Sequence, residues 1–245
     1  MNERIKKKIL KISLSIVIAI SILFVIMMYL VTYHEEGEGN LPFKISKIVI
    51  VSSTDGIVAE GQPTQWALSV NQNNDIYLYV DKNKNYGKTE LIENVKLSNF
   101  KIQKQTEKGE IKVYKTTTEE NKMFSNTAEF EITELTYVGD IQSNIKQEKI
   151  SNQGGIITFR CANNNVSKYL ADNVTEVNYN KLLKMTGVVQ EDLNVTITFD
   201  IEIKVVDKKT YQATVKLELP VEGIIDNGTT NLEITDLEDI AFKII

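Results

Sequence analysis

The chain has very few of the residues that build disulfides, metal sites and catalytic triads. Its 245 residues include one cysteine, one histidine and three prolines. A lone cysteine excludes an internal disulfide framework, and the two residues together are too few for a zinc site of cysteine and histidine ligands. A histidine-based triad would have to use His34. Hydrophobic residues make up 42% of the chain, which excludes a collagen-like or wholly disordered polypeptide.

Positive charge is concentrated at the N-terminus. The residues before His34 include one acid, Glu3, and five basic residues, which are Arg4, Lys6, Lys7, Lys8 and Lys11. The rest of the chain has 23 basic and 32 acidic residues, a net charge of −9, and its only arginine is Arg160. Phosphate backbones repel such a surface, so we expect no nucleic-acid partner.

An uncharged apolar segment follows the basic tail of residues 1–11. Residues 12–31 read ISLSIVIAISILFVIMMYLV. About twenty apolar residues are enough for a helix to cross a bilayer core, and aromatic residues such as Tyr29 and Tyr33 favour its interface. The sequence therefore predicts a transmembrane helix over residues 12–33, with the lipid bilayer as its partner. Because basic residues stay on the cytoplasmic side, the C-terminal bulk is expected outside the cytoplasmic membrane.

Two other roles for this segment are less consistent with the sequence. A cleaved signal peptide would have a shorter apolar core and a small-residue cleavage site, whereas the segment is followed by TYHEEGEGNLP. A type IV pilin would continue its helix, whereas Gly37 and Pro42 would end it. We therefore expect an uncleaved signal anchor, then a linker over residues 34–42.

Residues 43–245 show mainly strand periodicity. The clearest pair is Val195–Val205 and Tyr211–Leu219, whose apolar residues alternate with polar ones on either side of a turn at Asp207. This pattern predicts an antiparallel hairpin. Nine further strands are expected, at 43–51, 66–70, 76–80, 91–102, 111–114, 128–138, 156–159, 232–234 and 241–245. The predicted fold is mainly β: an antiparallel β-sandwich behind the transmembrane helix.

Local irregularities qualify this prediction. The alternation changes phase at Ser98-Asn99 and at Thr133-Glu134, which indicates β-bulges or bends. One short helix is expected near Tyr179–Met185, capped by Asn178 or Asn180 and ended by Gly187. Polar stretches at residues 116–126 and 142–155 leave open a division into two smaller sandwiches.

A polar segment after the expected strand 76–80 is similar to the start of a calcium loop. Asp81, Asn83 and Asn85 place oxygen ligands at alternate positions, as a hard cation requires. However, Tyr86 stands where such a loop needs glycine, and Ile92 where it needs a bidentate glutamate. These three residues are weak metal-ligand candidates, and an ordinary polar turn is the alternative.

Aromatic residues in the same region are candidates for ligand binding. Trp66, Tyr77, Tyr79 and Tyr86 could form a flat platform on which sugar rings stack. The alternative is packing within the sheet, because strands favour aromatic residues. The sequence predicts no cofactor.

Other reactive or modifiable residues give weaker signals. Cys161 follows Arg160, which could lower its thiol pKa, but an inert buried thiol is the simpler interpretation. His34 fits a solvated linker position. Four Asn-x-Ser/Thr triplets begin at Asn165, Asn173, Asn194 and Asn227, and in a chain so rich in Asn, Lys and Ile we interpret them as chance occurrences.

Three stretches carry a resemblance to a family. They are EGEGNLPFKIS at residues 36–46, the adjoining residues 47–52, and QNNDIYLYVDKNKNY at residues 72–86. Together with the N-terminal anchor, they resemble uncharacterised single-pass membrane proteins of low-GC, clostridial-type Gram-positive bacteria. The resemblance implies a bacterial cell surface, and no activity or ligand comes with it.

These observations favour a non-enzymatic interaction or assembly module of the bacterial cell envelope, whose partner is another envelope protein. The residues 241–245 could be an edge strand that a partner extends, or simply the last strand of the domain's own sheet. A glycan-binding module, a carboxylate-dependent hydrolase and a signalling sensor are the alternatives, and the cytoplasmic tail of about eleven residues is too short to fold as a domain.

Overall fold

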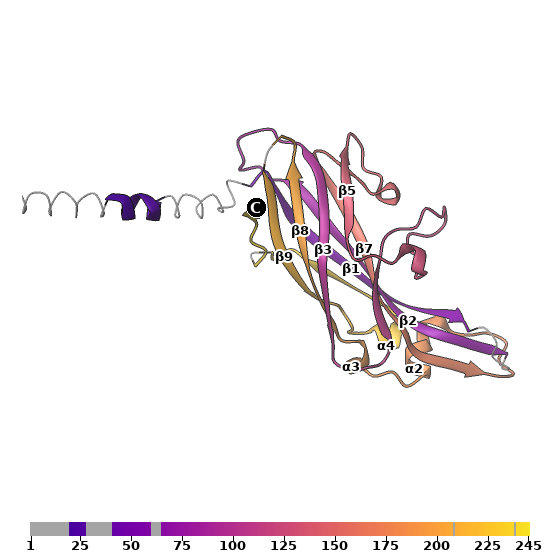
Figure 1. Ribbon diagram of the computed structural model, residues 1–245. Helices are drawn as coiled ribbons and strands as arrows, with labels where there is room; N and C mark the ends of the chain where they lie inside the picture. The colour runs from indigo at the N-terminus through magenta and orange to yellow at the C-terminus, as the bar shows by residue number, and fades with distance from the viewer. Residues whose placement is uncertain (1–19, 28–40, 60–64, 208, 238) are drawn as a thin grey trace, which may run out of the picture. The chain divides into compact units, whose positions relative to one another are not determined.

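The computed structural model describes residues 20–27, 41–59, 65–207, 209–237 and 239–245 (Figure 1). It divides the chain into two compact units, Met1–Leu41 and Pro42–Ile245. The units are described separately below.

In the first unit residues 20–27 are helical. Their apolar side chains are exposed, from 48% at Ile26 to 66% at Val25. Among the described residues, no helix has both the length and the apolar character needed to cross a bilayer. The basic tail, His34, and most of the predicted membrane segment and linker lie outside the described residues.

The second unit contains two sheets. Sheet A has the strand order β10-β1-β2-β7-β4, and sheet B has the order β11-β9-β8-β3-β5-β6. The strands are β1 (Phe43–Val58), β2 (Trp66–Lys82), β3 (Ile92–Lys104), β4 (Glu110–Tyr114), β5 (Leu135–Asp140), β6 (Lys149–Ser151), β7 (Gly154–Ala171), β8 (Val195–Val205), β9 (Thr210–Glu218), β10 (Thr229–Ile234) and β11 (Lys243–Ile244). The prediction of a mainly β chain is confirmed.

The apolar faces of the two sheets meet in a shared core. Phe159 of β7 packs edge-on against Phe199 of β8, with ring centroids 5.2 Å apart, and Phe100 of β3 contacts both rings. Tyr137 of β5 crosses between the sheets, and its hydroxyl donates to the carbonyl of Thr158 at 2.9 Å. Alternation along β8 explains this arrangement, because every second residue from Val195 to Val205 is buried.

Several strands match the sequence prediction, and others differ in length or direction. The hairpin of β8 and β9 is confirmed, with Ile197 opposite Leu217 and Ile203 opposite Tyr211. The expected strands 66–70 and 76–80 are one strand, β2, because the polar residues between them lie within the sheet. Sheet B is not wholly antiparallel, since β5 and β6 run parallel.

The two predicted phase changes have different outcomes. The shift at Ser98-Asn99 is a bulge: the register with β8 slips between Ser98 and Lys101, and Asn99 has φ 56°. The prediction of a strand from Ala128 is wrong, because η2 (Ala128–Phe130) is a 3-10 turn and β5 begins only at Leu135. There the change of phase marks the entry into a strand.

Six short helical turns accompany the sheets among the described residues, where the sequence predicted one. The predicted one is present as η4 (Tyr179–Lys181) and α2 (Leu182–Met185); Asn178 accepts a bond from the Asn180 N–H, and Gly187 has φ 67°. The others are η2, η3 (Ile145–Gln147), α3 (Gln190–Leu193) and α4 (Ile224–Asn227). They are too short to show apolar periodicity in the sequence.

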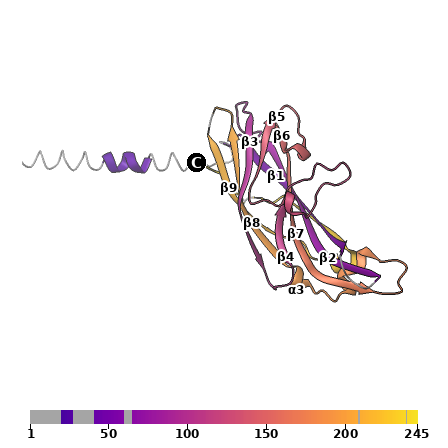
Figure 2. The same cartoon turned by 45° about the vertical axis from the view of Figure 1, so that its right-hand side comes forward.

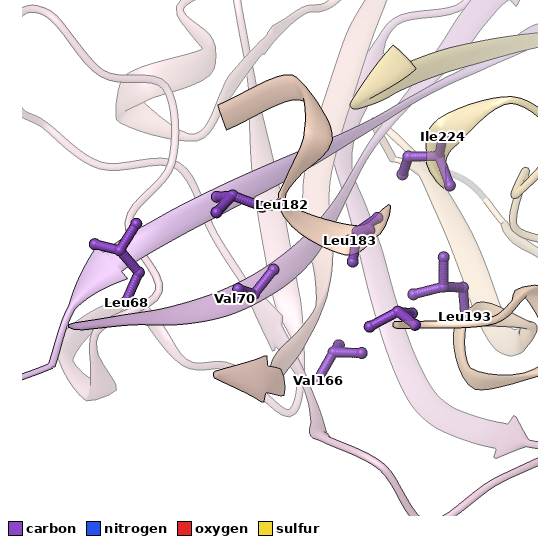
Figure 3. Close-up of a cluster of buried hydrophobic side chains, with 8 residues drawn as sticks. Leu68, Val70, Val166, Leu182, Leu183, Leu193 and Ile224 are labelled. Carbon is purple, nitrogen blue, oxygen red and sulfur yellow. The ribbon is translucent and has the colours of Figure 1, made fainter. Parts of the chain in front are cut away.

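The long strands β1, β2 and β7 continue past the end of sheet B towards α2 and α4 (Figures 1 and 2). There the inner face of sheet A is covered by a second hydrophobic group, the distal cluster, in which the side chains point towards one another (Figure 3). Its buried members are Leu68, Val70, Val166, Leu182, Leu183, Val188, Leu193 and Ile224. Gly56 faces this cluster, and a Cβ there would lie 2.8 Å from Leu182 Cδ1.

The segments considered as domain boundaries and as a free edge are part of the second unit. Residues 116–126 fold back beside β4 through a bridge between Thr116 and Phe124, and residues 142–155 include η3 and β6. At the C-terminus, Lys243 and Ile244 pair with Gln212 and Tyr211 of β9. The last residues therefore add a strand to their own sheet.

Candidate functional site: the outer face of sheet A

The outer face of sheet A, which points away from sheet B, concentrates polar and aromatic side chains. On β2, Asn74, Ile76 and Leu78 are buried on the inner face, so Asp75 and Tyr77 lie on the outer face. Because β2 is a central strand of the sheet, its outer residues have neighbours from β1 on one side and β7 on the other.

Asp75 and Arg160 form the centre of this face. They stand opposite each other on β2 and β7. Arg160 Nε donates to Asp75 Oδ1 at 2.6 Å, and Arg160 Nη2 donates to Asp75 Oδ2 at 3.0 Å. Their side chains are only 14% and 16% exposed, so the pair is largely withdrawn from water. Such a bidentate pair fixes geometry as well as charge.

Asn126, in the segment that follows β4, completes this hydrogen-bond network on the outer side of the sheet. Its Oδ1 accepts from Arg160 Nη1 at 3.2 Å, and its Nδ2 donates to Asn73 Oδ1 at 2.8 Å and to Asn164 Oδ1 at 2.9 Å. Phe124, two residues earlier, lies 4.9 Å from the Arg160 guanidinium. The segment after β4 is thereby held against the sheet. Since both Asp75 oxygens are bonded, the network positions chain segments rather than offering a free acid or base.

Tyr77 and Tyr79 lie beside this network in successive outer positions of β2. Across the strand pair, Tyr77 faces Val49 and Tyr79 faces Lys47, whose Nζ lies 4.5 Å from the Tyr79 ring centroid. Burial and the nearby Asp75 carboxylate raise the pKa of Tyr77, and Arg160 partly offsets this. Val51 adds a side chain that is 37% exposed. The result is a firm, partly apolar surface with polar neighbours.

The structure brings together only two of the four residues of the predicted aromatic platform. Trp66 begins β2, eleven residues before Tyr77, and its indole nitrogen donates to Val174 O at 2.7 Å. Tyr86 lies in the turn after β2, where its hydroxyl bonds to Glu90 at 3.4 Å. A strand advances about 3.3 Å per residue, so Trp66 is roughly 36 Å from Tyr77.

The residues considered as calcium ligands form a turn. Asn83 Oδ1 accepts from the backbone N–H of Asn85 at 3.0 Å, which is an Asx turn, and Asp81 accepts from the Ser46 hydroxyl. Asn83 is buried, whereas Asp81 and Asn85 are exposed. Within the described residues, no group of three or more His, Cys, Asp or Glu side chains could hold a metal ion.

The remaining candidate groups are held by burial or ion pairing. Cys161 is fully buried on the inner face, and burial raises its thiol pKa to about 12. It therefore lies on the opposite face from Arg160. Among the surface acids, hydrogen bonds from Lys149 and Lys184 lower the pKa values of Asp140 and Asp226 respectively. These acids are held as carboxylates.

The central network was missed in the sequence, although one signal was available. Arg160 is the only arginine after the N-terminal tail and stands within the apolar stretch ITFRCA. A charged residue inside a central strand needs a partner, which could have prompted a search for an acid on a neighbouring strand. The choice of Asp75 and Asn126 depends on strand register and on the path of the chain after β4.

The chain has no match among protein-family models, curated proteins or solved structures.

Proposed function

We propose that this protein is a membrane-anchored interaction module of a bacterial cell envelope. In this proposal the apolar segment of residues 12–33 spans the cytoplasmic membrane once, as an uncleaved signal anchor. The acidic β-sandwich lies outside the membrane and binds another envelope protein through the outer face of sheet A. The module is non-enzymatic.

The outer face carries this proposal. Tyr77, Tyr79 and Val49 form a partly exposed surface on central strands, and Asp75–Arg160 fixes the backbone beside it. Tyrosine and arginine are enriched where proteins bind one another, because a rigid aromatic side chain offers contact area at low entropic cost. A prearranged surface also reduces the entropy lost on binding.

Anchoring is supported by the composition of the N-terminal unit. The helical residues 20–27 expose apolar side chains, which is costly in water and favourable in lipid. A tether to a membrane confines the second unit to a thin layer. A weak affinity for a membrane-bound partner is then sufficient, because the effective concentration is high.

A photo-cross-linking amino acid tests the binding face in intact cells. Placed at Tyr79, it should form adducts with one envelope protein; placed at Lys216, on the exposed face of sheet B, it should not. Equal adducts at both positions, or none at Tyr79, would contradict the proposed face. External protease on spheroplasts separately tests the topology, since the C-terminal unit should be digested.

Glycan binding is the second candidate, because Tyr77 and Tyr79 lie next to amide and carboxylate groups. Stacking on two adjacent rings would be the main contact. Calorimetry with cell-wall glycans, comparing the full-length protein with Tyr79→Ala, distinguishes it. Heat that disappears in the variant favours this candidate, and no heat with the unaltered protein excludes the glycans tested.

A further inference from the structure

Three side chains form a polar row across the inner face of sheet A. Thr54 on β1 stands opposite Gln72 on β2, and Gln72 stands opposite Asn163 on β7. Gln72 is fully buried and Asn163 is 1% exposed. Within the described residues, four buried atoms of this row have no hydrogen-bond partner: Thr54 Oγ1, Gln72 Oε1, Gln72 Nε2 and Asn163 Oδ1.

The adjacent row shows that direct pairing is possible on the same face. Ser52 Oγ donates to Asn74 Oδ1 at 2.5 Å, and Asn74 Nδ2 donates to Cys161 O at 3.0 Å. Asn74 is 1% exposed, so it is as buried as Gln72. The side-chain amides of Gln72 and Asn74 are therefore equally buried, but only that of Asn74 has hydrogen-bond partners in the protein.

The backbone is irregular beside Gln72. The register between β2 and β7 slips between Val70 and Gln72, so that Asn71 alone faces three residues of β7. One of these, Asn165, has φ 56°, and its N–H bonds to Asn71 Oδ1 at 2.8 Å. Such a bulge interrupts the ladder and separates the strands locally.

An unpaired buried amide is expensive. A buried donor or acceptor that lacks a hydrogen-bond partner destabilises the folded state, and Gln72 has both a donor and an acceptor to satisfy. Proteins meet this need with internal water, about one molecule per 27 residues, each making about three hydrogen bonds. A water site needs several polar atoms, and this row places polar side chains from three adjacent strands in register; Asn163 Nδ2 is itself bonded to Asp192 O at 3.4 Å.

We propose that the Thr54–Gln72–Asn163 row binds buried, ordered water, with the Gln72 amide as its principal ligand and the partly exposed Thr54 on the side towards solvent. The site separates the distal cluster from the apolar rows around Ile76 and Phe159. It is independent of the function proposed above, because it lies on the opposite face of the same sheet.

Side-chain amide NMR of the full-length protein in detergent tests the site directly. The Gln72 amide protons should show cross-relaxation with long-lived water, whereas the Asn74 amide proton that is donated to Cys161 O should not. A Gln72 amide without any water contact, or one bonded directly to a protein atom, would overturn the proposal. The Asn74 resonances provide the internal control.

The sign of a stability change gives a second test. If water links Gln72 to its neighbours, the substitution Gln72→Leu leaves the neighbouring polar atoms buried without a hydrogen-bond partner. The unfolding equilibrium constant should then rise about fivefold or more. If the amide is dry, removing it should lower that constant instead. Should the variant fail to fold, the NMR result on the unaltered protein still decides the question.

Discussion

Arg160 and Asp75 form two hydrogen bonds, at 2.6 and 3.0 Å, between the third and fourth strands of sheet A. The pair is 14% and 16% exposed, and Asn126 joins it to the segment that follows β4. The pair thus holds the loop that contains Asn126, 34 residues before Arg160 in the chain, against the sheet.

Arg160→Lys should lower the free energy of unfolding by about 2–4 kcal/mol, because a lysine cannot make the bidentate pair and also contact Asn126. Urea unfolding of the full-length protein in detergent measures the change. The control is Lys184→Met, which removes an ion pair with Asp226 whose partners are 61% and 62% exposed, and it should cost no more than about 0.5 kcal/mol. Similar losses in both variants would contradict the role given to Arg160.

Tyr137→Phe should cost about 1–3 kcal/mol of unfolding free energy. The Tyr137 hydroxyl donates to Thr158 O and accepts from Thr158 N–H, so its removal leaves two buried backbone groups without that partner. Tyr179→Phe alters a residue that is 42% exposed and should stay within about 0.5 kcal/mol. A Tyr137→Phe protein as stable as the parent would show that the bridge between the sheets is dispensable.

Asp192 should contribute stability that is lost in acid. Burial opposes its ionisation, but hydrogen bonds from Lys108, the Val189 N–H and Thr106 together lower its pKa. A lowered folded-state pKa gives stability that is fully present above the unfolded value of about 3.9 and disappears as the pH falls through the folded value. The stability difference between the parent and Asp192→Asn should therefore shrink below about pH 4. Unfolding curves at pH 7, 5, 4 and 3 measure it, and a difference that is constant over this range would contradict the assignment.

Two glycines with positive φ should respond differently to alanine. Gly187 has φ 67° and open space around its Cα, so Gly187→Ala should cost about 1 kcal/mol for the left-handed backbone alone. Gly228 has φ 72°, and a Cβ there would lie 2.5 Å from the Asn180 Cα. Because backbone has to move, Gly228→Ala should cost about 3 kcal/mol or more. Thermal unfolding of both variants tests this, and equal costs would mean that α4 shifts freely away from η4.

The periodic segments show what could be predicted about the fold and the site. The β8–β9 hairpin was predictable because one face of each strand packs in the core and the other faces water. Apolar and polar residues therefore alternate along both strands. The bulge at Asn99 was visible for the same reason. The prediction of one strand over residues 128–138 was wrong because a 3-10 turn followed by a strand gives the same change of phase as a β-bulge within a strand. Residues 71–75 give no strand signal in the sequence, because polar side chains stand on both faces of β2 there and do not alternate with apolar ones.

The sequence by itself determined the acidic, mainly β body, its strongest hairpin, and the apolar N-terminal segment, because each depends on residues close together in the chain. Only the tertiary structure decided that Asp75 meets Arg160, that Trp66 is far from Tyr77 and Tyr79, and that Thr54, Gln72 and Asn163 form one buried row. These contacts join residues on different strands, so they follow from strand order and register. A shift of one residue in register would turn every outer side chain inward, and that register is set by packing across the whole core.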